Sequence, residues 1–358
     1  MARKKKFPKP DSINSIPPTT AITSNKFSFS GDLLTILFCV LYFIVEFIPG
    51  MGGVDDMGAQ WFYIVILNFI VAMYILNTKK QFEFPFLQTV KSGFSKLYLS
   101  LFLLAGVSVL FSINHTEGWV CYARFIATVI AFFNISLLLF EKNYLFKLLA
   151  QILSVILLIQ SIQAISVFLT GMQSYRLTEL ILAMKGYAGN KNIFATSLLT
   201  KIPFVLFGIY ITRLPGKIIN GIIFFIASLT IILLNSRTNY LCLFLEMIAF
   251  LAICLFQIYK KKNAVENLQR IGIVVVLVAV SFFISITLIT AAKNSFQDSA
   301  IDANQYGSVV ERISSISSAN DESNQQRLSY GVMPQNMPKH TLSWVVDMVT
   351  GKLLPFHM

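Results

Sequence analysis

Long apolar runs are the feature that most constrains this chain. They recur along most of its length, and each spans about 18–22 residues, which matches the thickness of a lipid bilayer. Inside lipid, every backbone amide of a spanning helix has to find its hydrogen-bond partner within that helix. The sequence therefore predicts an all-α, polytopic helical membrane protein with about nine transmembrane helices. The runs lie near residues 32–48, 59–76, 95–112, 119–140, 147–170, 193–212, 217–234, 239–258 and 271–291.

Composition excludes a soluble globular domain. Only 13% of the 358 residues are charged and 55% are hydrophobic, whereas soluble domains carry roughly 25% charged residues. The formal net charge of +12 would suggest a nucleic-acid partner in a soluble protein. In a membrane protein it instead indicates cytoplasmic loops that face anionic lipids. We therefore expect membrane lipids, and no nucleic acid, among the partners.

The loops between the runs alternate in charge, which predicts the orientation. Two loops of one set, "PGMGGVDDM" and "NHTEG", contain no lysine or arginine. The other set is rich in them and should face the cytoplasm, together with the basic, Pro/Ser/Thr-rich and disordered tail 1–30. An odd number of spans in the domain 31–291 then places residues after about 292 outside, in the periplasm if the membrane is a bacterial inner membrane. The cytoplasmic set comprises Arg3, Lys4, Lys5, Lys6, Lys79, Lys80, Lys91, Lys96, Lys142, Arg213, Lys217, Lys260, Lys261, Lys262 and Arg270.

Some cations lie on the outer side, where the charge rule disfavours them. The stretch "LLNSRTNYL" puts Arg237 in a very short turn between two spans, and Arg327 lies in the terminal segment. An outer guanidinium could bind a phosphate through paired, charge-assisted hydrogen bonds. The alternative for a single arginine is that it reaches up to the lipid headgroups.

The stretch "MKGYAGNKNIFATSLL" is a second candidate anion site. Gly186 and Gly189 allow a tight turn, and Asn190, Lys191 and Asn192 supply donors directly before a helix N-terminus. Free backbone amides and the helix dipole favour an anion there. The alternative is an ordinary turn in which Asn192 caps the helix.

Four ionisable residues lie within the spans, and such residues are functional candidates because burying a charge in lipid is costly. Glu46 and Arg124 are close enough to the outer boundary to reach the headgroups. Lys201 and Glu246 could pair with each other or line a cavity. We expect Arg124 to be the functional one of the four.

Motifs for hydrolase, ATPase and metal chemistry are missing from the sequence. It contains no HExxH, GxSxG, Walker loop or DxD carboxylate cluster. No metal and no cofactor are therefore predicted.

The order of the unusual stretches resembles a known family. A Gly-Asn-Lys-Asn turn opens one helix, a Ser-Arg turn follows about two spans later, and an outer loop carries a second arginine in "DESNQQRLSY". This pattern is similar to the O-antigen ligase and O-antigen polymerase superfamily, bacterial glycosyltransferases of the multi-span C type. The resemblance covers residues 30–330 in hydropathy and 185–330 in motifs, and it implies the C-type glycosyltransferase fold.

The resemblance implies a reaction and a set of binding residues. Such proteins move a glycan from undecaprenyl pyrophosphate to a hydroxyl of lipid A-core in ligases, or of the growing repeat unit in polymerases, without a nucleotide sugar or metal. Arg237 matches the position proposed to hold the pyrophosphate and Arg327 the second arginine, with Arg124, Lys191 and Asn190 as further candidates. Cations that neutralise the pyrophosphate leaving group would lower the barrier. Ligase and polymerase remain alternatives.

The end of the sequence departs from the family. After the second arginine the family continues with an aromatic residue, a "hPllGxGxGN"-like stretch and a histidine that is its candidate general base. Codons can be chosen for Gly331 to Phe356 so that restoring one base near Tyr330 gives "YWGDASKHAKTHPLLGCGYGNWKIAS". We therefore expect residues 292–330 to begin a large periplasmic loop and 331–358 to be out of frame, with His340 and His357 unrelated to the family histidine.

Resequencing the gene across the codon for Tyr330 tests this expectation. The expected result is one missing base, which is either a real deletion in the gene or a sequencing error. The chain as written should then be inactive in glycan transfer, because no catalytic residue is assigned within it. An unbroken reading frame at that codon, or transfer of labelled glycan by the purified chain, would contradict the hypothesis.

A transporter or flippase for a lipid-linked glycan is the alternative from another class. It would share the outer cations and the many spans. It should also show two similar halves, or broken helices in matching positions. The sequence shows no such repeat, which favours the transferase.

Overall fold

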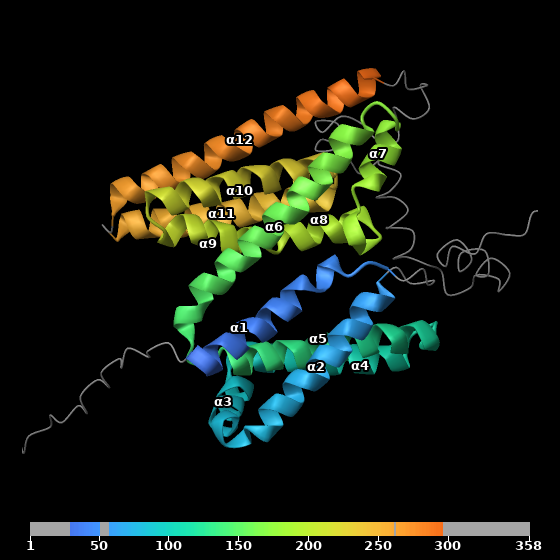
Figure 1. Ribbon diagram of the computed structural model, residues 1–358, viewed down its shortest axis with the longest axis vertical. Coiled ribbons are helices and arrows are strands. Elements are labelled where there is room, and N and C mark those ends of the chain that lie inside the picture. Colours follow the sequence, from blue (N-terminus) through green and yellow to red (C-terminus); the bar gives the residue numbers. More distant parts are fainter. Residues whose placement is uncertain (1–28, 51–56, 261–262, 296–358) are drawn as a thin grey trace, which may run out of the picture.

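The computed structural model describes residues 29–50, 57–260 and 263–295 (Figure 1). All regular elements in these ranges are helical, so the predicted all-α class is confirmed for them. The elements are α1 (Phe29–Phe43), η1 (Ile44–Phe47), α2 (Gly58–Asn77), α3 (Lys79–Lys91), α4 (Gly93–Leu110), α5 (His115–Leu138), α6 (Asn143–Gly171), α7 (Leu177–Ala183), η2 (Gly186–Ala188), α8 (Lys191–Leu199), α9 (Ile202–Ile211), α10 (Leu214–Leu233), α11 (Arg237–Tyr259) and α12 (Ala264–Ser295). The basic tail, Arg327, His340, His357 and the segment expected to be out of frame lie outside the described residues.

The helices follow the predicted spans closely. Within the described ranges, eight helical segments are long and apolar enough to cross a bilayer, with α8 and α9 together forming one of them. This is the architecture of a polytopic helical membrane protein. The first predicted span, 32–48, is divided between α1 and η1, and α1 alone has only 15 residues. The short helices α3 and α7 were not predicted, because neither has the length of a span.

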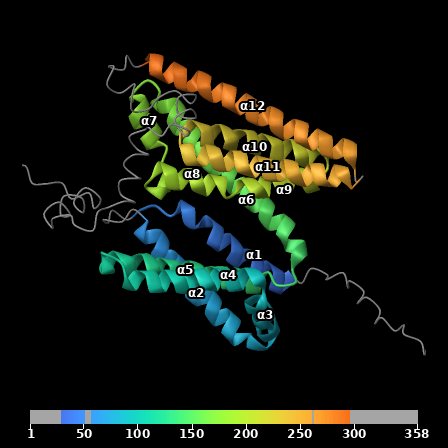
Figure 2. The same cartoon turned by 180° about the vertical axis from the view of Figure 1, so that it is seen from behind.

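The helices form two groups that lie side by side. Figure 1 shows α1 to α5 as one group and α6 to α12 as the other, and the reverse view in Figure 2 shows the same division. Helix α6 connects the groups by packing against α1 as well as against α9 and α10. In the most apolar window of α10, 61% of the residues are buried, against 11% in α4. Helix α10 is therefore the centre of the larger group, and α4 presents its apolar side chains outward, as a lipid-facing helix does.

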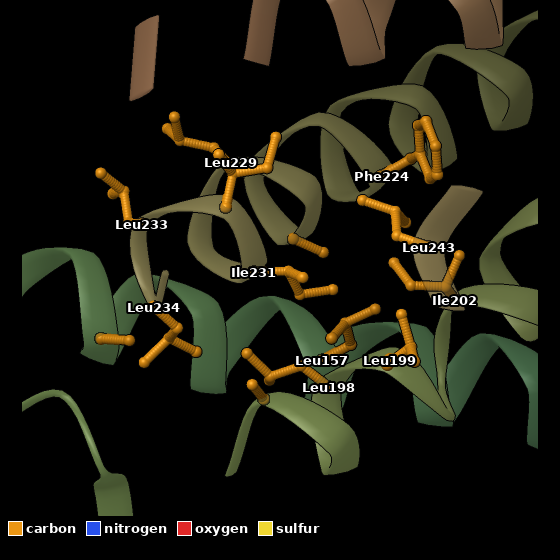
Figure 3. Close-up of a cluster of buried hydrophobic side chains, with 14 of the residues drawn as sticks. Leu157, Leu198, Leu199, Ile202, Phe224, Leu229, Ile231, Leu233, Leu234 and Leu243 are labelled. Carbon is orange, nitrogen blue, oxygen red and sulfur yellow. The ribbon is translucent and has the colours of Figure 1, made fainter. Parts of the chain in front are cut away.

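The main hydrophobic core belongs to the larger group. Leu157 of α6, Leu198 of α8 and Ile231 of α10 are fully buried and lie close together (Figure 3). A smaller core joins α1, α2 and α5, where Tyr42 donates a hydrogen bond to Asn68 Oδ1 over 2.7 Å. Asn68 in turn donates to the Ala127 carbonyl over 2.8 Å. Polar side chains thus connect the helices of the smaller group, as is common inside membranes.

One end of the bundle collects the helix termini that carry most of the predicted cytoplasmic cations. We call the end at which α1, α6, α10 and α12 begin the basic end, and it lies at the left of Figure 1. Lys142 forms an ion pair with Asp32 there at 3.2 Å, which joins the beginnings of α1 and α6. Lys217 forms one with Glu266 at 2.6 Å, which joins the beginnings of α10 and α12. The loops predicted to be cytoplasmic therefore share one end of the molecule.

Candidate functional site

A pocket of about 750 Å³ lies between the two helix groups. Its walls come from η1, α2 and α5 on one side and from α6, η2 and α8 on the other. The beginnings of α2 and α8 both lie in its wall, so the pocket is in the half of the bundle opposite the basic end. A volume of this size falls within the range of small-molecule sites.

An ion pair between two distant segments lies at the pocket, and its carboxylate partner, Glu46, is part of the lining. Lys201 Nζ lies 2.6 Å from Glu46 Oε2, although the residues are 155 positions apart. The same carboxylate oxygen accepts hydrogen bonds from Gln160 Nε2 at 2.7 Å and from Ser197 Oγ at 2.6 Å. Lys201 also donates to Ser197 Oγ over 2.8 Å. The lysine side chain is 6% exposed and the glutamate side chain 32% exposed, so the carboxylate is the accessible partner.

Two prolines explain why charged residues can meet at this depth. Pro49 disfavours helical geometry at Ile48, which is extended, so the first span ends in the short turn η1 that carries Glu46. Pro203 lies in the first turn of α9 and cannot continue the hydrogen bonding of α8, so the sixth predicted span is interrupted at Lys201. Both interruptions lie at the pocket, since Glu46 and Thr200 line it.

Of the two alternatives for Lys201 and Glu246, pairing with each other or lining a cavity, the mutual pair does not form. Lys201 pairs with Glu46 and not with Glu246, whose Oε2 is buried in α11 without a hydrogen-bond partner among the described residues. Glu46 also does not extend to the surface, because three donors hold it against α6 and α8. Glu46 and Lys201 are 155 positions apart in the chain, so no local sequence pattern indicates that they pair.

The Gly-Asn-Lys-Asn turn lies beside the pocket. Gly186 and Gly189 adopt positive φ angles of 57° and 69°, as the predicted tight turn requires. Asn190 is the N-cap of α8, and its Oδ1 accepts the Asn192 backbone N–H over 2.8 Å. The ordinary capping turn is thus present, with Asn190 as the cap and not Asn192. Lys191 is the first residue of α8, directly before the pocket-lining Asn192.

Gln60 connects this turn to the other wall. Its Nε2 donates to the carbonyls of Ile48 at 3.1 Å and Tyr187 at 3.2 Å. Because both neighbours are carbonyl oxygens, the amide nitrogen has to face them and Oε1 faces away. Gln60 is 5% exposed and lines the pocket. The beginning of α2, the end of the first span and η2 are therefore held together by one side chain.

Arg124 and Arg237 approach the same region from α5 and α11. The Arg124 guanidinium carbon lies 5.9 Å from the ring centroid of Trp61, a pocket residue. Arg237 is half-buried at the first position of α11 and does not line the pocket itself. Asn239, two residues further on, accepts a hydrogen bond of 3.3 Å from the pocket residue Thr196. Four of the five predicted site residues thus belong to elements that converge on this end, and the fifth, Arg327, is outside the described residues.

Among the described residues, no group of three or more His, Cys, Asp or Glu side chains could hold a metal ion. Sequence reasoning missed Gln60, Gln160 and Ser197, whose polar side chains give no signal of their own in an apolar span. Pro49 and Pro203 were the available signals, since each interrupts a span next to a charged residue.

Comparison of the chain with protein-family models, with curated proteins and with solved structures finds no match in any of the three.

Proposed function

We propose that this chain binds a glycan carried on undecaprenyl pyrophosphate and is related to the O-antigen ligase-like glycosyltransferases, although the chain as written should be inactive in transfer. The observation that supports this most is the convergence of Arg124, Lys191 and Arg237, from three different helices, on the end of the bundle opposite the basic end. A pyrophosphate needs cations for binding and for leaving-group neutralisation. The acceptor would be lipid A-core or another glycan.

The pocket favours the hypothesis that the cations bind a pyrophosphate headgroup over a purely structural role for them. A cation that only contacts lipid headgroups needs no cavity beside it. Here the helices that carry the cations reach a pocket of about 750 Å³: α5 and α8 contribute Thr128 and Asn192 to its lining, and Asn239 of α11 is hydrogen bonded to the lining residue Thr196. No cofactor is part of the proposal, since neutralising a pyrophosphate requires only these side chains.

The proposed membrane is a bacterial inner membrane with the basic end in the cytoplasm. Lys142 and Lys217 belong to loops at that end, which the positive-inside rule assigns to the cytoplasm. The pocket then opens toward the periplasmic half, where a lipid-linked glycan is available after translocation. Residues after about 292 would be periplasmic.

Removing the guanidinium of Arg237 should weaken binding of the carrier. The full chain in lipid nanodiscs should bind undecaprenyl pyrophosphate, and Arg237→Ala should raise the Kd about 10–100-fold, because hydrogen bonds to charged groups contribute about 1.5–3 kcal/mol. Undecaprenol, which has no phosphate, should bind wild type and variant equally. Native mass spectrometry or thermophoresis measures both.

Arg213→Ala is the matched control, since Arg213 is an exposed arginine at the basic end. It should leave the Kd unchanged. Equal losses in both variants, or no loss in Arg237→Ala, would contradict the proposal.

The orientation of Arg237 provides a separate test. With the exposed Cys121 replaced by alanine, a Thr238→Cys variant should react with an impermeant maleimide in intact cells. Reaction only after lysis would put Arg237 on the cytosolic side and would also contradict the proposal.

A lipid-linked glycan transporter is the second candidate, and one observation favours it. The first and sixth predicted spans are both interrupted, at η1 and at Lys201, and the interruptions meet at the pocket. Transporters commonly bind substrates at such discontinuous helices. Translocation of a fluorescent lipid-linked glycan in proteoliposomes separates the candidates, because a transferase does not move the carrier between leaflets.

A further inference from the structure

The pocket contains hydrogen-bonding groups that no described residue satisfies. In the described part of the chain, no group donates to Glu46 Oε1, since all three donors bind Oε2. The Gln60 nitrogen is held by two carbonyls, and its Oε1 receives no hydrogen bond from a described residue. The exposed Asn192 side chain also lines the pocket. These groups come from η1, α2 and α8, so they surround the space from different sides.

Their chemistry defines what could fill the pocket. Glu46 and Gln60 present acceptors, and the Asn192 amide can both donate and accept. A hydroxyl group can satisfy both kinds because it donates one hydrogen bond and accepts others. The ligand should also be neutral where it meets Glu46, because Lys201 already balances that carboxylate at 2.6 Å. A polyhydroxyl compound therefore fits this part of the pocket. A phosphate would instead be expected beside the cations Arg124 and Lys191.

The remaining walls fit a ring with apolar faces. Met57, Trp61, Ile193 and Phe194 line the same pocket. Sites for small polar molecules combine such apolar walls with a few placed polar groups. A pyranose offers hydroxyls at its edge and C–H groups on its faces, so it matches both parts of the lining.

The Ser197–Lys201 contact does not make this a nucleophile site. A serine–lysine pair activates the hydroxyl only when the lysine is neutral and can accept its proton. Here Lys201 donates to Glu46 at 2.6 Å, and the Ser197 hydroxyl donates to the same oxygen. The Ser197 hydroxyl proton is therefore directed at the carboxylate and not at the lysine, and the cluster orients Glu46 with Oε1 available to a ligand.

We propose that this pocket is a sugar subsite that holds the pyranose nearest the pyrophosphate, with Glu46 Oε1, Gln60 Oε1 and the Asn192 amide as its hydrogen-bond partners. The inference rests on the proposed function for the identity of the carrier. It assigns the neutral, hydroxyl-binding part of the site to η1, α2 and α8, and leaves the phosphates to the cations beside them.

The test compares two carriers on the full chain in nanodiscs. Undecaprenyl pyrophosphate bearing one N-acetylglucosamine should bind about tenfold tighter than bare undecaprenyl pyrophosphate, the difference that one or two net hydrogen bonds produce. Ala188→Phe puts a ring into the pocket and should make the two Kd values equal. Ala183→Phe makes the same change at an exposed alanine of α7 outside the lining and should keep the ratio.

Asn192→Ala gives a second readout that does not depend on filling the pocket. It should reduce the ratio, while Asn143→Ala, at an exposed first-turn asparagine of α6 at the basic end, should not. An unchanged ratio in Ala188→Phe, or equal affinity of the two carriers for wild type, would overturn the subsite.

Failure of the proposed function gives a different result. If bare undecaprenyl pyrophosphate does not bind wild type, the carrier assignment fails, and the subsite is then judged with methyl N-acetylglucosaminide alone. Saturation-transfer NMR should show this sugar on wild type and lose the signal in Ala188→Phe. Absence of the signal on wild type would overturn the subsite itself.

Discussion

Replacing Glu46 with alanine should destabilise the helical bundle by about 3 kcal/mol, the cost typical of leaving one partner of a buried ion pair alone. Lys201 would then remain 6% exposed, with Ser197 as its hydrogen-bond acceptor among the described residues. Gln160 and Ser197 would also lose their common acceptor. Thermal unfolding of the purified chain in one detergent, followed by tryptophan fluorescence, measures the change.

The reciprocal variant provides the control. Lys201→Met removes the more buried charge and leaves Glu46 32% exposed to the pocket, still hydrogen bonded by Gln160 and Ser197. Its cost should be about 1 kcal/mol, since an accessible carboxylate keeps part of its hydration. Equal losses for Glu46→Ala and Lys201→Met, or no loss for either, would show that the pair is not buried as described.

Glu266→Ala should be the second most destabilising change, at about 2–3 kcal/mol. This carboxylate serves two cations, Lys217 at 2.6 Å and Arg270 at 2.9 Å, whose side chains are 12% and 8% exposed. Removing it leaves both without a carboxylate partner among the described residues. Because Glu266 itself is 39% exposed and partly hydrated, we expect the loss of unfolding free energy to be smaller than for a fully buried ion pair. The same thermal assay applies.

Two matched variants locate the cause of this effect. Glu266→Gln keeps an acceptor for Lys217 and should lose less than the alanine variant. Glu83→Ala removes an exposed carboxylate of α3 and should change the stability by no more than about 0.5 kcal/mol. If Glu266→Ala behaves like Glu83→Ala, then Arg270 is held sufficiently by the Tyr210 carbonyl at 2.6 Å and by the Tyr210 ring at 4.4 Å.

Sequence patterns indicated two of the segments beside the pocket but not the residues that they contact. The interruption of α8 at Lys201 and the glycine turn before Asn190 were both visible as unusual residues in or beside an apolar span. The sequence did not show that these two segments belong to one pocket, because the other wall comes from η1 and α2, more than one hundred positions away. Gln60 is the clearest case, since only the contact with the Tyr187 carbonyl shows why a glutamine occupies that position.

The sequence by itself determined the helices and their alternating direction. Both follow from local physics, since a spanning segment needs a certain length and apolarity and must satisfy its own backbone hydrogen bonds. Only the tertiary structure decided that Lys201 meets Glu46 instead of Glu246, and that α1 ends in η1 beside α8. Those outcomes depend on how helices pack against each other, and a buried charge pairs with whichever opposite charge that packing brings within hydrogen-bonding distance.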